Sequence, residues 1–184
     1  MKSKRAVLAG TGLMVVAALF LFGGCTGSST RSDLVVVGVN GGATYFSDLI
    51  NEADTAKVFI PIDQITVTLG NQPHDGGAPL AAGTAFSEIV VTGYSVTYDN
   101  GVFSPISGGL NVVVSSGGTG DALLTISNPS EKGALLGTLT STVTSTATIT
   151  FTGYVRTTGG VGDAVSGSGT LTVQVDNFGD SDLP

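Results

Sequence analysis

Apolar and polar residues alternate along several segments of this chain, and such alternation predicts β-strands with one buried face. Three segments show the pattern clearly: 63–69, 146–156 and 169–175. The polar residues between the apolar ones are mostly Thr, Ser or Gln, which suit the solvent side of a strand. The apolar positions, which we expect in the core, are Ile65, Val67, Leu69, Ala147, Ile149, Phe151, Leu171, Val173 and Val175.

The segment Glu88–Tyr98 is the best strand candidate, because it is long and rich in Val, Ile, Thr and Tyr. Its even-numbered positions carry the aromatic side chains of Tyr94 and Tyr98. We therefore expect the face with Val90, Thr92, Tyr94, Val96 and Tyr98 to meet the core. The opposite face, with Ile89 and Val91, is expected to lie outside.

Turn signals divide the rest of the chain into short segments. Asn40-Gly41-Gly42 ends the apolar run 34–39 and predicts a turn into a partner strand at 43–50. Asp99-Asn100-Gly101 predicts a hairpin with a return strand at 101–106. Strands at 110–115 and 122–127 are expected to pair around the glycines of 117–121.

The segment after Pro129 interrupts the strand pattern. Pro129 and Ser130 favour a single helical turn, and Gly133 and Gly137 argue against a long helix. Three leucines are then expected to plug one end of the fold: Leu135, Leu136 and Leu139.

Seven to nine short strands with at most one helical turn predict an all-β fold. The spacing favours an antiparallel β-sandwich of immunoglobulin-like type. A transmembrane barrel is disfavoured, because the chain lacks the aromatic residues of two membrane girdles. The similar segments 89–94 (IVVTGY) and 149–154 (ITFTGY) predict two equivalent central strands.

The first 24 residues follow another pattern. Lys2, Lys4 and Arg5 precede a charge-free segment, 6–24, which ends in Gly-Gly before Cys25, the only cysteine. This is the layout of a secretory signal with a small-residue cleavage site. With Cys25 directly after the small residues, it resembles a bacterial lipoprotein signal, although Phe22 stands where that signal prefers Leu. The resemblance implies diacylation of the Cys25 thiol, cleavage before it and acylation of the new amino terminus.

Two other interpretations of this segment remain open. At about 1.5 Å per residue, its 19 residues are long enough to cross a bilayer as a permanent helix. Four glycines dilute its apolar character, however, and no Trp, Tyr or basic residue closes its far side. An ordinary secretory signal cut elsewhere would leave Cys25 without a role.

A further resemblance rests on the strand Glu88–Tyr98, the Leu-rich segment 130–139, the Ile-Thr-Phe-x-Gly strand and the motif Asp176-Asn-Phe-Gly-Asp. Together they resemble small uncharacterised lipoproteins of environmental Gram-negative bacteria over residues 58–180. The resemblance implies a fold and a cellular location, but it implies no catalytic residues. Thr26, rather than Asp, follows Cys25, which by analogy implies the outer membrane.

These observations predict a signal peptide at 1–24, a lipidated Cys25 with a flexible polar tether at 25–33, and one sandwich domain at 34–184. Removing 1–24 takes three of the seven cations, so four cations face 14 acidic residues, a formal net charge of −10. This charge argues against nucleic acid as a partner. With Cys25 acylated, no thiol is left for a disulfide.

Candidate chemical groups are few. His74, the sole histidine, and Asp75 are weighed as metal ligands or an acid–base pair against an exposed turn. Glu88 and Glu131 are weighed as paired acids of a glycosidase. Gly167-Ser168-Gly169 lacks the strand-to-helix context of a nucleophile elbow, and Gly117–Gly120 lacks the Lys of a phosphate loop.

Acidic residues on loops offer weak candidates for a calcium site. Asp176, Asp180 and Asp182 cluster near the carboxyl end, and Asp99 and Asp121 lie on other expected loops. Calcium takes six to eight oxygen ligands, which such loops supply at the ends of β-sandwiches. Solvated acidic turns are the alternative, and no cofactor is expected.

The sequence therefore predicts a lipid-anchored, non-enzymatic envelope protein with a structural or protein-binding module. Its partners are the membrane, through Cys25, and an envelope protein of unknown identity. The alternative is a module that binds carbohydrate or extracellular polymer, or adheres. In that case Tyr94, Tyr98 and Tyr154 would form an exposed platform.

Overall fold

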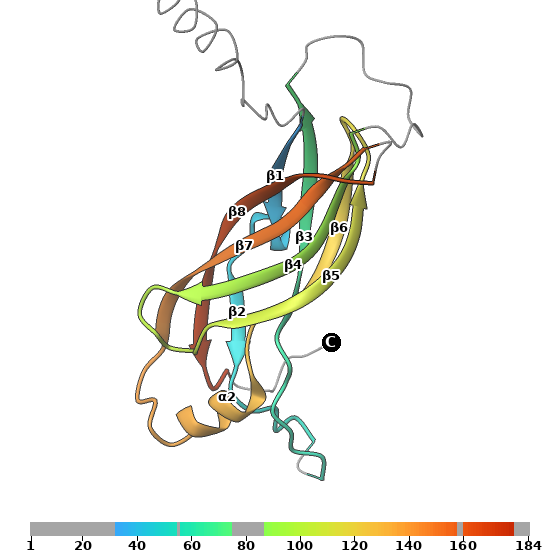
Figure 1. Ribbon diagram of the computed structural model, residues 1–184. Coiled ribbons are helices and arrows are strands. Elements are labelled where there is room, and N and C mark those ends of the chain that lie inside the picture. Colours follow the sequence, from blue (N-terminus) through green and yellow to red (C-terminus); the bar gives the residue numbers. More distant parts are fainter. Residues whose placement is uncertain (1–31, 55, 75–86, 158–159, 179–184) are drawn as a thin grey trace, which may run out of the picture.

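A computed structural model describes residues 32–54, 56–74, 87–157 and 160–178 of this chain (Figure 1). Eight strands and two short helical segments follow one another along it. They are β1 (Ser32–Val39), η1 (Asn40–Gly42), β2 (Tyr45–Asp48), β3 (Gln64–Pro73), β4 (Ile89–Tyr98), β5 (Ile106–Val114), β6 (Thr119–Thr125), α2 (Pro129–Leu135), β7 (Val143–Thr157) and β8 (Gly160–Asp176). No helix in these ranges is long and apolar enough to span a bilayer.

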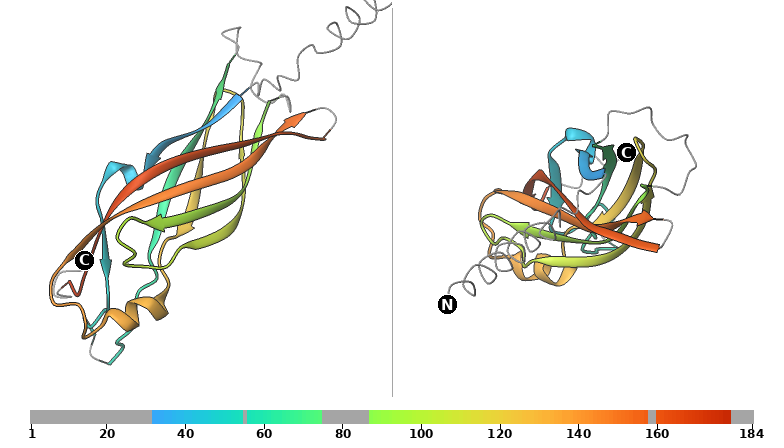
Figure 2. Two further views of the ribbon diagram at one scale, coloured as in Figure 1. Left: turned by 60° about the vertical axis from the view of Figure 1, so that its left-hand side comes forward. Right: turned by 45° about the horizontal axis from the view of Figure 1, so that its top comes forward.

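The strands form two sheets that enclose one core, which is the expected all-β sandwich. One sheet has the order β1-β3-β6 and the other has the order β2-β8-β7-β4-β5. Every strand pairing is antiparallel except that of β2 with β8. Figures 1 and 2 show α2 at one end of the sandwich and the beginning of β1 at the other.

The alternating pattern correctly identified the inward-facing residues of β3, β7 and the second half of β8. All nine apolar side chains expected in the core are at most 4% exposed. The similar segments 89–94 and 149–154 lie in β4 and β7, which are neighbours inside the five-stranded sheet. The interior is thus formed by the apolar half of each alternating strand.

The core face predicted for β4 is correct in only half of the strand. The pairing of β4 with β7 shifts between Val91 and Gly93, so that Thr92 is an extra residue in β4. A bulge of this kind reverses which positions face inward. Before it, Ile89 and Val91 lie in the core, and Val90 is buried outside the core cluster. After it, Val96 and Tyr98 are buried, whereas Thr92 is exposed.

The expected hairpin around Asn40-Gly41-Gly42 does not form. Asn40 and both glycines have positive φ and make the tight η1 turn, which carries the chain away from β1 and over to the other sheet. There β2 pairs in parallel with the end of β8, from Tyr45–Val173 to Asp48–Asp176. The chain therefore changes sheet between its first two strands.

Two other expected pairings differ in detail. The return strand after Asn100-Gly101 begins only at Ile106, because 101–105 is a loop that buries the ring of Phe103. The strands on either side of Gly117–Gly118 do not pair with each other. β5 pairs with β4 and β6 pairs with β3, so this connection crosses from one sheet to the other.

Close passage of β1 over β8 depends on glycine. A Cβ atom added at Gly167 would lie 2.5 Å from the backbone oxygen of Leu34, and one at Gly169 would lie 2.7 Å from the Val36 side chain. These glycines let the first strand lie directly on the last one. Gly109 in β5, by contrast, has no heavy atom within 4 Å of such a position.

Replacing Gly167 with Ala should therefore destabilise the protein by about 1–3 kcal/mol, because the Leu34 backbone has to move. The matched change Gly109→Ala should leave the free energy of unfolding within about 0.5 kcal/mol of its original value. Urea denaturation of both variants measures the difference. Equal midpoints would show that the contact between β1 and β8 is not tight.

Candidate functional site

The short helix α2 brings its side chains to one end of the sandwich. Asn128 caps it by accepting a hydrogen bond from the Ser130 backbone N–H at 3.0 Å, and Pro129 occupies the first turn. Gly137, with φ of 78°, follows the helix. The leucines expected to plug this end do pack against the core: Leu135, Leu136 and Leu139.

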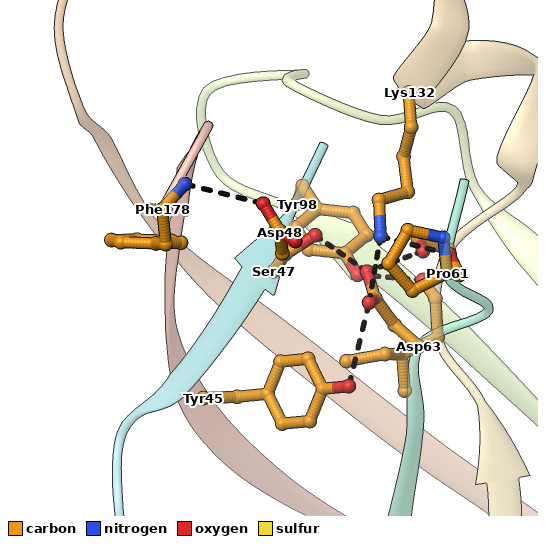
Figure 3. Close-up of polar contacts among 10 residues, drawn as sticks. Tyr45, Ser47, Asp48, Pro61, Asp63, Tyr98, Lys132 and Phe178 are labelled. Carbon is orange, nitrogen blue, oxygen red and sulfur yellow. Dashed lines mark hydrogen bonds and ion pairs between the residues drawn. The ribbon is translucent and has the colours of Figure 1, made fainter. Parts of the chain in front are cut away.

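The same helix places a lysine in the interior. The Lys132 side chain is 0% exposed, and its Nζ donates to Asp63 Oδ1 at 2.8 Å and to the Pro61 carbonyl at 2.9 Å (Figure 3). The Asp63 side chain is only 2% exposed. This buried ion pair joins residues 69 positions apart in the sequence.

The Asp63 carboxylate has a donor on every side. Ser47 from β2 and Ser127, just after β6, each donate to Oδ2 at 2.5 Å. Tyr45 donates to Oδ1 from 3.4 Å, on the same oxygen as Lys132 (Figure 3). We call Lys132, Asp63, Ser47, Ser127 and Tyr45 the lysine–aspartate cluster.

Tyr45 of this cluster and the neighbouring Tyr98 have raised pKa values. Burial, followed by the negative charge of Asp63, raises the pKa of Tyr45 to about 12. The pKa of Tyr98 is raised by the same two causes in the same order. Its hydroxyl donates to the Ile126 carbonyl at 2.6 Å, and its ring packs edge-to-face on Phe103. Both hydroxyls therefore stay protonated and act as donors at neutral pH.

Burial gives this cluster its electrostatic character. Each charge has lost its hydration, so the two groups depend on each other and on the hydroxyl donors for stabilisation. The same burial excludes water and holds an amine and a carboxyl group in contact. The arrangement can hold α2 against β2 and β3, and it can support chemistry between the two groups.

His74, the histidine candidate, contacts a residue other than the expected Asp75. His74 Nε2 lies 2.5 Å from Asp33 Oδ2 on β1, and both side chains are about half exposed. Asp75, the expected partner, lies outside the described residues. Among the described residues, no three His, Cys, Asp or Glu side chains are grouped as a metal would require.

The two glutamates weighed as a glycosidase pair are engaged separately. Glu88 pairs with Arg156 at 3.0 Å, where β4 begins and β7 ends. Glu131, in the first turn of α2, accepts the Ser104 backbone N–H at 2.9 Å. The structure thus places them near opposite ends of the sandwich and does not bring them together.

Of the weak calcium candidates, Asp176 is the one described. It accepts hydrogen bonds from the Thr142 hydroxyl and from the Asn177 backbone N–H. Asp180 and Asp182 lie outside the described residues, as does Cys25, the expected lipidation site.

The acidic residues on the other expected loops are also held by nearby donors. Asp121 accepts the Thr68 hydroxyl at 2.8 Å. Asp99 accepts from Ser145 Oγ and from the Thr146 N–H, and these bonds lower its pKa, the Ser145 bond most.

The tyrosines considered for a binding platform do not share an open surface. Tyr98 is buried, and Tyr94 is half-buried, with its hydroxyl donating to the Thr125 carbonyl across the core. The Tyr94 ring lies on Gly108, where an added Cβ would be 2.5 Å away. Tyr154 is half-buried near the end of β7.

A different surface emerges on the outer face of the five-stranded sheet. Between its two ends, its outward positions on β4, β5, β7 and β8 carry no charged side chain; Arg156 and Asp176 lie at the ends of β7 and β8. Hydroxyls align across the strands in rows, such as Ser107–Ser95–Thr150–Ser168 and Thr97–Thr148–Thr170. We call this surface the hydroxyl face; it comprises Thr92, Ser95, Thr97, Ser107, Asn111, Thr144, Thr146, Thr148, Thr150, Thr152, Ser166, Ser168, Thr170, Thr172 and Gln174.

Comparisons of this chain with protein-family models, with curated proteins and with solved structures found no match.

Removing the Lys132 charge should be costly. Lys132→Met leaves the Asp63 carboxylate buried without its cation, so we expect a loss of about 3–5 kcal/mol in the free energy of unfolding. Lys57→Met is the matched control, because the Lys57 side chain is 83% exposed and only 3.9 Å from Asp54 in a surface pair. Chemical denaturation followed by circular dichroism measures both. A loss below about 1 kcal/mol for Lys132→Met would contradict the importance of the pair.

Proposed function

We propose that this chain is a lipid-anchored protein of the cell envelope, and that its sandwich is a non-enzymatic structural or protein-binding module. The observation that carries this proposal is the run of cations, apolar residues and Gly-Gly directly before Cys25. Two or three acyl chains at that residue would anchor the chain stably, which a single chain would not. The outer membrane of a Gram-negative bacterium is the proposed location.

The position of β1 supports an orientation for the anchored domain. Residues 25–31 span at most about 25 Å when fully extended, at roughly 3.5 Å each, so the Ser32 end of the sandwich stays near the membrane. The ten residues of β3 run from that end to α2 over about 30 Å, at roughly 3.3 Å each. The far end carries exposed apolar side chains on the segment before β3: Val58, Phe59 and Ile62. These favour a protein partner on the side away from the membrane.

We also propose that the sandwich is of immunoglobulin-like type. The strand orders β1-β3-β6 and β2-β8-β7-β4-β5 correspond to the immunoglobulin orders A-B-E and A′-G-F-C-C′. The crossing from β1 to β2 then corresponds to a first strand divided between the sheets. Such sandwiches commonly serve in cell-surface proteins, which agrees with the proposed location.

Replacing Cys25 with Ser tests the anchor. The full chain should lose its acyl mass and move from the membrane fraction to the soluble fraction, or remain as unprocessed precursor. Ser29→Ala, in the tether, should still be cleaved before Cys25 and partition with membranes. Intact-mass spectrometry and detergent phase separation measure both properties. A wild-type chain that carries Met1 and no acyl group, and a Cys25→Ser chain that remains equally membrane-bound, would indicate a permanent helix instead.

The hydroxyl face favours a second candidate function, the binding of a neutral carbohydrate polymer. Rows of Ser and Thr hydroxyls offer both donors and acceptors, which match the hydroxyls of a sugar chain. The outer face of the three-stranded sheet differs, since it carries Asp33 and Asp121. An uncharged face suits a neutral partner, because no charge has to be desolvated on contact.

Placing a charge on this face should abolish such binding. In affinity electrophoresis through gels that contain a neutral β-glucan, the detergent-solubilised chain should be retarded. Thr148→Lys should reduce the retardation at least tenfold, because it interrupts the row Thr97–Thr148–Thr170. Thr66→Lys, on the exposed face of β3, is the control and should behave as wild type. Equal mobility of all three chains with and without the polymer would argue against this function.

A further inference from the structure

The lysine–aspartate cluster places a primary amine against a carboxyl group in a dry interior. Lys132 Nζ is 2.8 Å from Asp63 Oδ1, and neither side chain is more than 2% exposed. Lys132 has no freedom to point elsewhere, because the Pro61 carbonyl also binds its Nζ at 2.9 Å. When two such groups reach an attack geometry, with the reacting atoms about 3–3.5 Å apart, effective concentrations of roughly 10⁵–10⁸ M are attained.

We propose that Lys132 and Asp63 condense spontaneously to an isopeptide bond, which joins Lys132 Nζ to Asp63 Cγ and releases one water molecule. The bond would covalently link α2 to Asp63, the residue directly before β3. It does not depend on the acylation of Cys25 or on the identity of any partner of the domain.

The reaction needs no group that the cluster lacks. One proton passes from the Lys132 ammonium to Asp63 Oδ1, which gives a neutral amine and a neutral acid. The amine nitrogen then attacks Cγ, and negative charge develops on Oδ2. A second proton passes from the nitrogen to Oδ1, the Cγ–Oδ1 bond breaks, and Oδ1 leaves as water. Ammonium plus carboxylate thus becomes amide plus water, with no oxidant, reductant or other reactant.

The serine hydroxyls are placed where this reaction needs them. Ser47 and Ser127 both donate to Oδ2 at 2.5 Å, the atom on which the intermediate carries its negative charge. Donors fixed in this way before the reaction act as an oxyanion hole. Tyr45 donates to Oδ1, the oxygen that leaves, from 3.4 Å.

The product would also suit its surroundings better than the ion pair. The new amide is neutral, so the desolvation of two buried charges is relieved. Its oxygen, the former Oδ2, keeps the hydrogen bonds from Ser47 and Ser127. Its N–H has the Pro61 carbonyl as an acceptor. Every polar atom of the product therefore already has a partner.

A tryptic digest of the denatured full chain tests the proposal, because trypsin does not cleave after an acylated lysine. Cleavage at Lys57, Lys132 and Arg156 of an unlinked chain gives peptides 58–132 and 133–156. A linked chain should instead give the single peptide 58–156, one water molecule lighter than its sequence, and tandem mass spectrometry should locate the bond between Lys132 and Asp63. Recovery of mainly the two separate peptides at their unmodified masses would overturn the proposal.

Two variants of Asp63 distinguish this bond from other losses of water. Asp63→Asn should form the same amide with release of ammonia, so its linked peptide should have the mass of the wild-type product. Asp63→Ala offers no carboxyl group, and its chain should be cleaved fully after Lys132. Because all samples are denatured before digestion, an Asp63→Ala chain that folds poorly still gives a valid control. Loss of water combined with normal cleavage after Lys132 would place the dehydration elsewhere and overturn the proposal.

Discussion

The carboxylate of Asp63 has to be surrounded by donors, because it lies in the interior of a sandwich with almost no contact with water. A buried carboxylate without partners is strongly destabilising. The donors come from β2, from α2 and from Ser127, two residues after β6, and the backbone carbonyl of Asp63 accepts the Ile126 N–H as well. This one requirement therefore fixes where β2, β3, α2 and the end of β6 lie relative to one another. Apolar contacts alone would tolerate more than one arrangement of these elements.

A second buried polar side chain has a related role at the opposite end. Asn71, near the end of β3, is 3% exposed and donates to the carbonyls of Ser87 and Val114. Its backbone also bonds with Gly117 and Gly118, in the turn between the two sheets. Each end of the sandwich thus contains a polar side chain that satisfies groups from several segments. The hydrophobic core between them supplies most of the burial but little of this positional specificity.

The sequence predicted the strands well where apolar and polar residues alternate without interruption. It predicted them less well where pairing with a distant segment determines the structure. Alternation identified the buried residues of β3 and β7 because it reports a local property of the extended backbone. It did not detect the extra residue Thr92, which is defined by the pairing of β4 with β7. The parallel pairing of β2 was missed for the same reason, since Asn40-Gly41-Gly42 indicates a turn but not its destination.

The candidate site was beyond the reach of the sequence for a more general reason. Lys132 stands in a short polar segment, where a lysine is normally solvated, and Asp63 stands at the start of an alternating strand. Neither position carries a local signal of burial, and the two are 69 residues apart. The small number of cationic residues was the one available signal. Only four cations follow Cys25, and in so short a set a specific structural role for one of them is less surprising. The structure assigns such a role to Lys132, whereas Lys57 is exposed.

The distribution of charge over the folded domain makes this scarcity informative. Acidic side chains lie on the outer face of the three-stranded sheet and at the ends of the sandwich, whereas the hydroxyl face has none at its outward positions. Exposed sheet faces commonly carry Lys or Glu, which limit association between molecules. A sheet face without charged side chains can contact a neutral surface directly. On a protein anchored through Cys25 as proposed, such a face would run along the sides of the domain, whereas the exposed apolar residues near α2 would lie at the end away from the anchor. The two proposed contacts of this domain are thus separated in space and do not compete.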